Sequence, residues 1–185
     1  MSSQASASSK LSTRAIELLE RLAQAQQGPG RCIQPVGIVG PGNGGRAERA
    51  AAYEIANVLA HSGMSIICGG RGGVMESASQ GAYDAGGIVV GILPEEDVSA
   101  ANPYLTVGIP TGMGEMRNAL IARSSVCLVA IGGGMGTLSE VALGLKWGKP
   151  VFAIHEEIKL PGTTSLGSIG ELIEGVASCL LRDRS

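Results

Sequence analysis

Short apolar runs alternate along this chain with longer segments that show helical spacing of apolar residues. The runs cover residues 35–39, 65–68, 88–93, 127–131 and 151–154, and their Val and Ile content is typical of buried strands. The helical patterns cover residues 46–61, the segment that follows Gly73 to about residue 83, and residues 117–124, 137–147 and 168–181. This alternation predicts an α/β fold, a Rossmann-like doubly wound and mainly parallel sheet with helices on both faces.

Two parts of the chain depart from this alternation. Residues 1–34 form an N-terminal extension, with an expected disordered tail over residues 1–10 and a helix from Ser12 or Thr13 to about Gln27. This helix could dock on the body of the chain or on a partner subunit. Residues 94–113 are irregular, with a short strand expected within 104–109, and loops of this length are usually functional. Residues 35–185 are expected to form a single ligand-binding domain.

The composition of the chain argues against several classes of protein. The chain has 185 residues and a formal net charge of −2, which argues against a nucleic-acid surface. No apolar run approaches the roughly 18 residues of a membrane helix, and the Ser-rich start lacks the apolar core of a secretory signal. The four cysteines lie far apart and give neither a metal site nor a disulfide framework, so we expect reduced thiols and a cytoplasmic protein.

Glycine is the compositional outlier, with 29 residues that cluster directly after the apolar runs. Three glycine-rich turns cover residues 40–45, 69–73 and 132–136. If the strand at 127–131 returns beside the strand at 35–39, the winding reverses between them, and the three turns meet in the crevice where such sheets bind ligands.

The turn at 132–136 is the best candidate for a phosphate site. A strand, a glycine turn and a helix start aim backbone N–H groups and the positive end of the helix dipole at one point, and the Thr137 hydroxyl could add a donor. The alternative is a tight turn in which glycine only permits a positive φ. The candidate ligand-binding residues of the turns are Gly42, Asn43, Gly44, Gly70, Arg71, Gly72, Gly133, Gly134, Gly136 and Thr137.

Two charged residues, Arg117 and Glu140, are further candidates for ligand binding, and each also has a structural interpretation. Glu140 could be a carboxylate at the crevice, or it could close a capping box with Thr137. Arg117 could hold a phosphate or carboxylate, or it could be a solvated arginine or one paired with Glu115. The sequence has no GxxxxGK[ST] motif, which argues against nucleotide hydrolysis of the Walker type. The second strand ends at Cys68 rather than at an acidic residue that could hold a ribose, which argues against hydride transfer.

Three ordered motifs resemble a known group of proteins. They are GGRGGVME at 69–76, PTGMGEMRN at 110–118 and IGGGMGTLSE at 131–140. Together they are similar to the "possible lysine decarboxylase" superfamily, and within it to the molybdenum cofactor carrier proteins and their close bacterial relatives. The resemblance covers about residues 35–155 and implies a Rossmann-like fold and a homodimer or homotetramer.

The resemblance also implies two functions. The cytokinin-activating phosphoribohydrolases of the superfamily cleave a nucleoside 5′-monophosphate into base and ribose 5-phosphate, and their catalytic arginine and glutamate fall on Arg117 and Glu140. This chain lacks the histidine and the lysine of their Met-His-x-Arg-Lys helix, and Ile131-Gly132 replaces their Pro-type lead-in, which weighs against hydrolysis. The carrier branch holds the molybdenum cofactor through its phosphate without converting it. A carrier or storage protein is therefore expected, with a hydrolase or a nucleotide-sensing module as alternatives.

Overall fold

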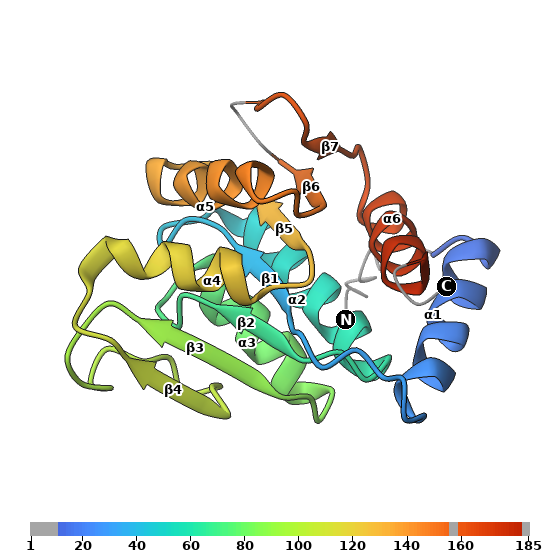
Figure 1. Cartoon of the computed structure of the whole chain (residues 1–185), viewed down its shortest axis with the longest axis horizontal. Coiled ribbons are helices and arrows are strands. Elements are labelled where there is room, and N and C mark those ends of the chain that lie inside the picture. Colours follow the sequence, from blue (N-terminus) through green and yellow to red (C-terminus); the bar gives the residue numbers. More distant parts are fainter. Residues whose placement is uncertain (1–10, 156–158, 183–185) are drawn as a thin grey trace, which may run out of the picture.

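The structure, a computed structural model, describes residues 11–155 and 159–182, so the expected tail at residues 1–10 lies outside the described residues. Its centre is a parallel sheet with the strand order β4-β3-β2-β1-β5-β6-β7 (Figure 1). The strands are β1 (Val36–Val39), β2 (Ile66–Cys68), β3 (Val89–Leu93), β4 (Val107–Pro110), β5 (Leu128–Ile131), β6 (Val151–Ile154) and β7 (Thr164–Ser165).

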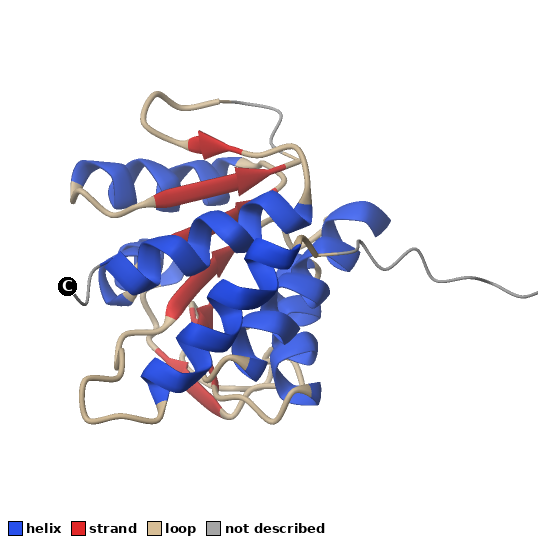
Figure 2. Ribbon diagram, turned by 90° about the vertical axis from the view of Figure 1, so that its right-hand side faces the viewer, coloured by secondary structure: helices blue, strands red, loops and turns tan. Residues whose placement is uncertain are grey.

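Helices cover both faces of this sheet (Figures 1 and 2). They are α1 (Thr13–Gln26), α2 (Arg46–His61), α3 (Val74–Asp84), the 3-10 helix η1 (Gly114–Arg117), α4 (Asn118–Ser124), α5 (Met135–Lys146) and α6 (Ile169–Arg182). The helices α2, α3 and α6 share one hydrophobic core with the sheet, and α4 and α5 share the other. The predicted Rossmann-like α/β architecture is confirmed.

The central strands show why the apolar runs are continuous rather than alternating. In β1, Ile38 lies in the core beneath α2 while its neighbour Val39 lies in the core beneath α4 and α5. In β5, Ile131 lies in the core beneath α2, and its neighbour Ala130 lies in the core beneath α4 and α5. Successive strand residues point to opposite faces, so a strand covered on both sides must be apolar at every position.

The N-terminal helix docks on the body of the same chain. Ser12 caps α1 by accepting a hydrogen bond from the Ala15 amide at 3.0 Å. Leu22 is fully buried and belongs to the core beneath α2 and α6, and Arg14 forms an ion pair with Glu174 of α6 at 3.0 Å. Of the two docking alternatives left open by the sequence, the structure shows packing on α6 within one chain.

The elements near the glycine turns differ slightly from expectation. The helix expected at 117–124 begins as the 3-10 turn η1, and α5 begins at Met135, earlier than the expected start at Thr137. The short strand expected within 104–109 is β4, and β7 was not expected. Among the described residues, no helix has the length and apolar character needed to span a bilayer.

Candidate functional site

The three glycine-rich turns meet at the carboxyl ends of β1, β2 and β5. The order β2-β1-β5 places β1 between the other two strands, so the winding of the chain reverses there. The Val74 amide, at the end of the second turn, donates to the carbonyl oxygen of Pro41 in the first turn at 3.2 Å. Gly40 lies so close to β5 that a Cβ atom at this position would be 2.6 Å from the Ile131 carbonyl oxygen. The predicted convergence of the turns is therefore present in the fold.

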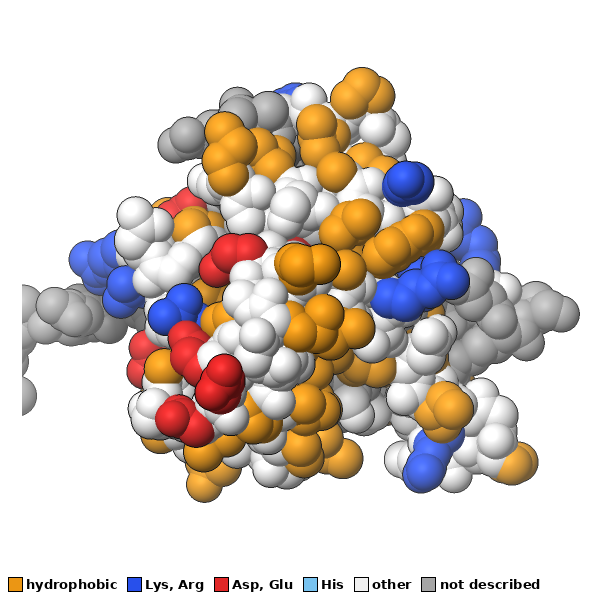
Figure 3. All heavy atoms as spheres, turned by 60° about the vertical axis from the view of Figure 1, so that its left-hand side comes forward, with side chains coloured by type: hydrophobic (Ala, Val, Ile, Leu, Met, Phe, Trp, Pro, Cys, Tyr) orange, Lys and Arg blue, Asp and Glu red, His pale blue; other side chains and the backbone are white. Residues whose placement is uncertain are grey.

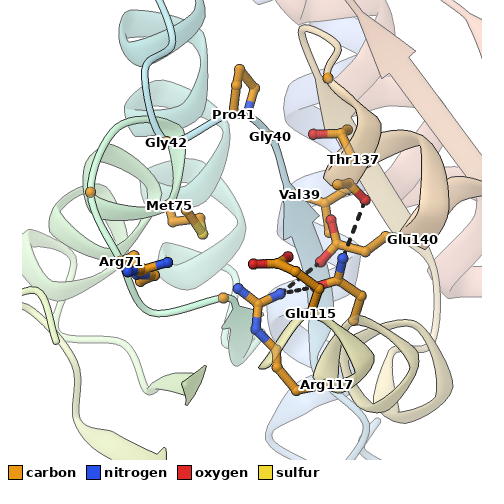
Figure 4. A pocket seen from close by; sticks show the side chains of 15 residues that line it. Val39, Gly40, Pro41, Gly42, Arg71, Met75, Glu115, Arg117, Thr137 and Glu140 are labelled. Atoms are coloured by element: carbon orange, nitrogen blue, oxygen red, sulfur yellow. Dashed lines mark hydrogen bonds and ion pairs between the residues drawn. The ribbon is translucent and has the colours of Figure 1, made fainter. Parts of the chain in front are cut away.

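A pocket of about 430 Å³ lies between these turns, and η1 and α5 complete its wall (Figure 4). Its lining contains eight of the residues that the sequence singled out, namely Gly42, Arg71, Gly72, Arg117, Gly134, Gly136, Thr137 and Glu140. Four other candidates, Asn43, Gly44, Gly70 and Gly133, are not part of the lining.

Two of the glycines outside the lining are held by packing. A Cβ atom on Gly44 would lie 2.7 Å from the side chain of Val74. Gly70 has a φ of +73°, and a Cβ atom there would lie 2.9 Å from the side chain of Leu93. Because side chains do not fit at these positions, Gly44 and Gly70 shape the turns that border the pocket.

The start of α5 forms an open wall of the pocket. Gly134 is the N-cap residue, and no side chain of the described residues caps the first turn of this helix. A Cβ atom on Gly134 would meet no described atom within 4 Å, and one on Gly136 would lie 3.9 Å from Asn118 Nδ2. Unpaired amides at a helix start, beside free space, favour an anionic ligand.

The capping-box interpretation of Glu140 is wrong. Because Gly134 occupies the N-cap position, Thr137 lies within the first turn of α5 rather than before it. The carboxyl group of Glu140 faces η1 instead, and its Oε1 lies 3.5 Å from Nη1 of Arg117. Glu140 thus belongs to the pocket wall (Figure 4).

Arg117 is buried, with 5% of its surface exposed, so the alternative of a solvated arginine is also wrong. Its Nη1 donates to the side-chain oxygen of Asn118 and to Glu140, not to Glu115. The Asn118 amide nitrogen donates in turn to Ser139 Oγ at 2.9 Å, and the Ser139 hydroxyl donates to the Gly136 carbonyl oxygen at 2.6 Å. This network ties η1 to the start of α5. Nε of Arg117 is buried and finds no partner among the described residues.

Burial makes Glu140 an unusual carboxyl group. Desolvation raises the pKa of Glu140 to about 8, although the positive charge of Arg117 lowers it; the negative charge of Glu115 raises it further. Glu140 is therefore mostly protonated at neutral pH. A carboxyl group with a pKa in this range can donate or accept a proton near neutral pH, which is what general acid–base chemistry requires.

The structure adds residues that the sequence did not single out. Asn102 is buried and holds the second turn, because its amide nitrogen donates to the carbonyl oxygens of Gly70 at 3.1 Å and Arg71 at 3.2 Å. Arg71 itself forms an ion pair with Glu95 at 2.9 Å. Asn102 and Glu95 both lie in the irregular segment 94–113. In the sequence, only the unusual length of this segment indicated that it has a functional role.

Comparisons with known proteins identify the family and the fold of this chain. A model of the SLOG cluster4 family matches residues 34–173. The molybdenum cofactor binding protein of Rippkaea orientalis has a similar structure, with 35% identity, a TM-score of 0.74 and coverage of 78% of this chain and 96% of its own. The molybdenum cofactor carrier protein of Chlamydomonas reinhardtii is 31% identical, with a TM-score of 0.73 and coverage of 80% and 99%.

An enzyme is also among the relatives. A probable cytokinin riboside 5′-monophosphate phosphoribohydrolase of Oryza sativa is 33% identical over 112 residues. These residues are 59% of this chain and 52% of the enzyme, so the match spans about half of the length of that protein.

Proposed function

Because this chain belongs to the SLOG cluster4 family, whose model covers residues 34–173, we propose that it is a carrier or storage protein for a phosphorylated small molecule, the molybdenum cofactor. The observation that carries this proposal is the open glycine wall of the pocket, where the uncapped start of α5 faces free space. The similarity to a cofactor binding protein and to a cofactor carrier protein supports the choice of ligand.

The residues of the pocket fit the phosphate group of such a ligand. The amides at the start of α5 and the hydroxyl of the buried Thr137 are donors beside the space that a Cβ atom on Gly134 would enter. The guanidinium of Arg117, which also lines the pocket, adds a positive charge. Each hydrogen bond to a charged group contributes about 1.5–3 kcal/mol, so a few of them suffice for micromolar binding.

Loading of the purified protein with molybdenum cofactor tests this proposal. The wild-type protein should retain the cofactor after gel filtration, measured as molybdenum content and as fluorescence of the oxidised pterin. Gly134→Asp should lose it, because the added carboxylate occupies the open space and repels a phosphate. Gly30→Asp is the matched control, since Gly30 also has free space around it but lies outside this pocket. Equal loading of Gly134→Asp, or no loading of the wild-type protein, would reject the site.

A hydrolase is the second candidate, and the contact between Arg117 and Glu140 favours it. These two residues match the catalytic pair that the superfamily resemblance implies, and the Oryza sativa relative is named as a probable phosphoribohydrolase. Two observations place it second. Desolvation raises the pKa of Glu140 to about 8, which disfavours at neutral pH the ionised form that supports an oxocarbenium-like charge. In addition, no lysine is part of the pocket lining formed by the described residues.

Incubation with nucleoside 5′-monophosphates distinguishes the two functions. A hydrolase would release base and ribose 5-phosphate, and the rate would rise through about pH 8 as Glu140 ionises. Release that does not exceed that of a Glu140→Ala variant would leave the carrier function alone.

We also expect the chain to form a homodimer or homotetramer, as the resemblance implies. Exposed apolar side chains support this expectation, because they gather on the face of the molecule that Figure 3 shows. Val107 and Ile109 of β4 and Leu120 of α4 are exposed by 44%, 42% and 39%, and contiguous exposed apolar patches are typical of subunit interfaces.

A further inference from the structure

One carboxylate in the pocket has no partner among the described residues. Glu115 of η1 lines the pocket and points into it, and in the view of Figure 4 its carboxylate lies between Arg71 and Glu140. The two arginines of the lining are engaged elsewhere, Arg71 with Glu95 and Arg117 with Asn118 and Glu140. No hydrogen bond or ion pair joins Glu115 to any described residue, so both of its oxygens are free to accept.

A free carboxylate gives the pocket two chemically different ends. At one end, near Pro41 and Thr137 in Figure 4, main-chain amides and a hydroxyl suit a phosphate. At the other end the exposed carboxylate of Glu115 carries a negative charge, which disfavours a phosphate there because like charges repel. The part of the ligand that carries no phosphate therefore belongs beside Glu115, and it must offer hydrogen-bond donors.

We infer that Glu115 selects a ring edge with two adjacent N–H donors, the ring N–H and the neighbouring 2-amino group that guanine and pterins share, and that it disfavours adenine. A carboxylate accepts two parallel N–H bonds in the way that it accepts an arginine fork. Adenine places a ring-nitrogen acceptor beside its amino group, and that acceptor would face a carboxylate oxygen without a proton between them. Met75, which also lines the pocket, offers a thioether against the flat face of either ring.

This inference rests on the proposed function, since it assumes that the phosphate lies at the start of α5. It assigns a specificity-determining residue and a ligand class to the same pocket. The Glu115→Gln variant separates this role from a merely structural one. A glutamine amide offers one acceptor and one donor, so it fits the amino group and ring nitrogen of adenine and no longer fits two donors.

The test uses GMP, AMP and ribose 5-phosphate as probes of the full chain by titration calorimetry. The wild-type protein should bind GMP about tenfold more tightly than AMP, because only GMP offers two N–H donors to the carboxylate. Glu115→Gln should abolish or reverse this preference while ribose 5-phosphate binds as before or more tightly. Glu96→Gln is the matched control, because Glu96 is exposed on the preceding loop and is not part of the pocket lining. If either nucleotide is cleaved, the ratio of kcat/KM values replaces the ratio of affinities.

Two outcomes would overturn the inference, and they are distinguishable. Equal affinity for GMP and AMP, or a ratio that Glu115→Gln leaves unchanged, together with binding of ribose 5-phosphate, would reject the role of Glu115 and retain the phosphate site. Failure of all three probes to bind would reject the phosphate site itself and the inference with it.

Discussion

The turn after β2 and the turn after β5 are similar in sequence and different in their surroundings. In the turn at 69–73, a Cβ atom on Gly69 would lie 2.5 Å from Arg117 Nη2, and one on Gly73 would lie 2.6 Å from the Pro41 carbonyl oxygen. In the turn at 132–136, a Cβ atom on Gly134 would have no described atom within 4 Å. The turn at 69–73 is packed at both ends, whereas the turn at 132–136 is packed at Gly132 and open to the pocket at Gly134.

This difference separates two reasons for a glycine. At Gly73 the backbone of another turn passes too close for any side chain, and the φ of +70° strains every residue with a Cβ atom. At Gly134 the backbone is extended, with a φ of −163°, so the conformation does not require glycine. Free space above an extended backbone is room for a ligand. Packed glycines therefore fix the geometry of the turns, and an open glycine offers the contact.

The largest expected effect is on the packed turn. Gly73→Ala should lower the free energy of unfolding by about 3 kcal/mol, because it combines a strained backbone with a clash against the first turn. Urea denaturation measures the loss. Gly72→Ala is the control in the same turn, since a Cβ atom there would meet only Glu76 Oε2 at 3.8 Å and the change should stay within about 0.5 kcal/mol. Equal stability of the two variants would contradict the distinction between packed and open glycines.

The next effect concerns the helix that follows the open turn. Glu140 has a pKa of about 8 in the folded protein and an ordinary value of 4.5, so between these values the folded state holds more protons than the unfolded state. Stability should therefore fall as the pH rises, by about 1.4 kcal/mol per pH unit or about 2 kcal/mol from pH 6 to pH 7.5. Glu140→Gln should lack this component, as seen in urea denaturation of both proteins at each pH. A constant difference between them would mean that Glu140 is ionised in the folded protein.

The smallest effect tests the open turn directly. Gly136→Ala should raise the free energy of unfolding by about 0.5 kcal/mol, because Gly136 lies in the first turn of α5 and alanine favours a helix. The same methyl group enters the pocket and should weaken phosphate binding. Thermal unfolding measures the change in stability. Titration with ribose 5-phosphate measures the change in affinity for phosphate. Weaker binding without a loss of stability would show that Gly136 is an open glycine. A destabilised variant would show instead that Gly136 is packed against its neighbours.

The sequence predicted most of the fold because the helices and strands repeat a strong local pattern. The bounds of α2, Arg46–His61, coincide with the apolar periodicity. The start of α5 was missed because Thr137 and Glu140 satisfy the spacing of a capping box, and only the extended backbone at Gly134 moves the cap upstream. Periodicity and spacing describe single elements, so they could not distinguish these two helix starts.

The candidate site was harder to predict, because its residues act through contacts between distant segments. Motif spacing indicated Arg117 and Glu140 but could not show that they contact each other. Asn102 has no motif, and its role depends on the position of the Gly70 and Arg71 carbonyl oxygens. The division of the glycines into packed and open depends likewise on neighbours such as Leu93 and Val74, which no local pattern specifies.

The meeting of the first and third turns has a consequence for folding. The carboxylate of Glu48, which accepts the amide hydrogen of Gly45 at the start of α2, occupies the space that a Cβ atom on Gly132 would take. The pocket thus closes only when segments of high sequence separation have come together, and such contacts form late because loop closure opposes them. A ligand that binds only the assembled pocket would stabilise the whole chain rather than one loop. At a hundredfold excess over its dissociation constant the gain would be about 2.7 kcal/mol, so a thermal-shift screen of phosphorylated metabolites would detect such a ligand whatever its chemical identity.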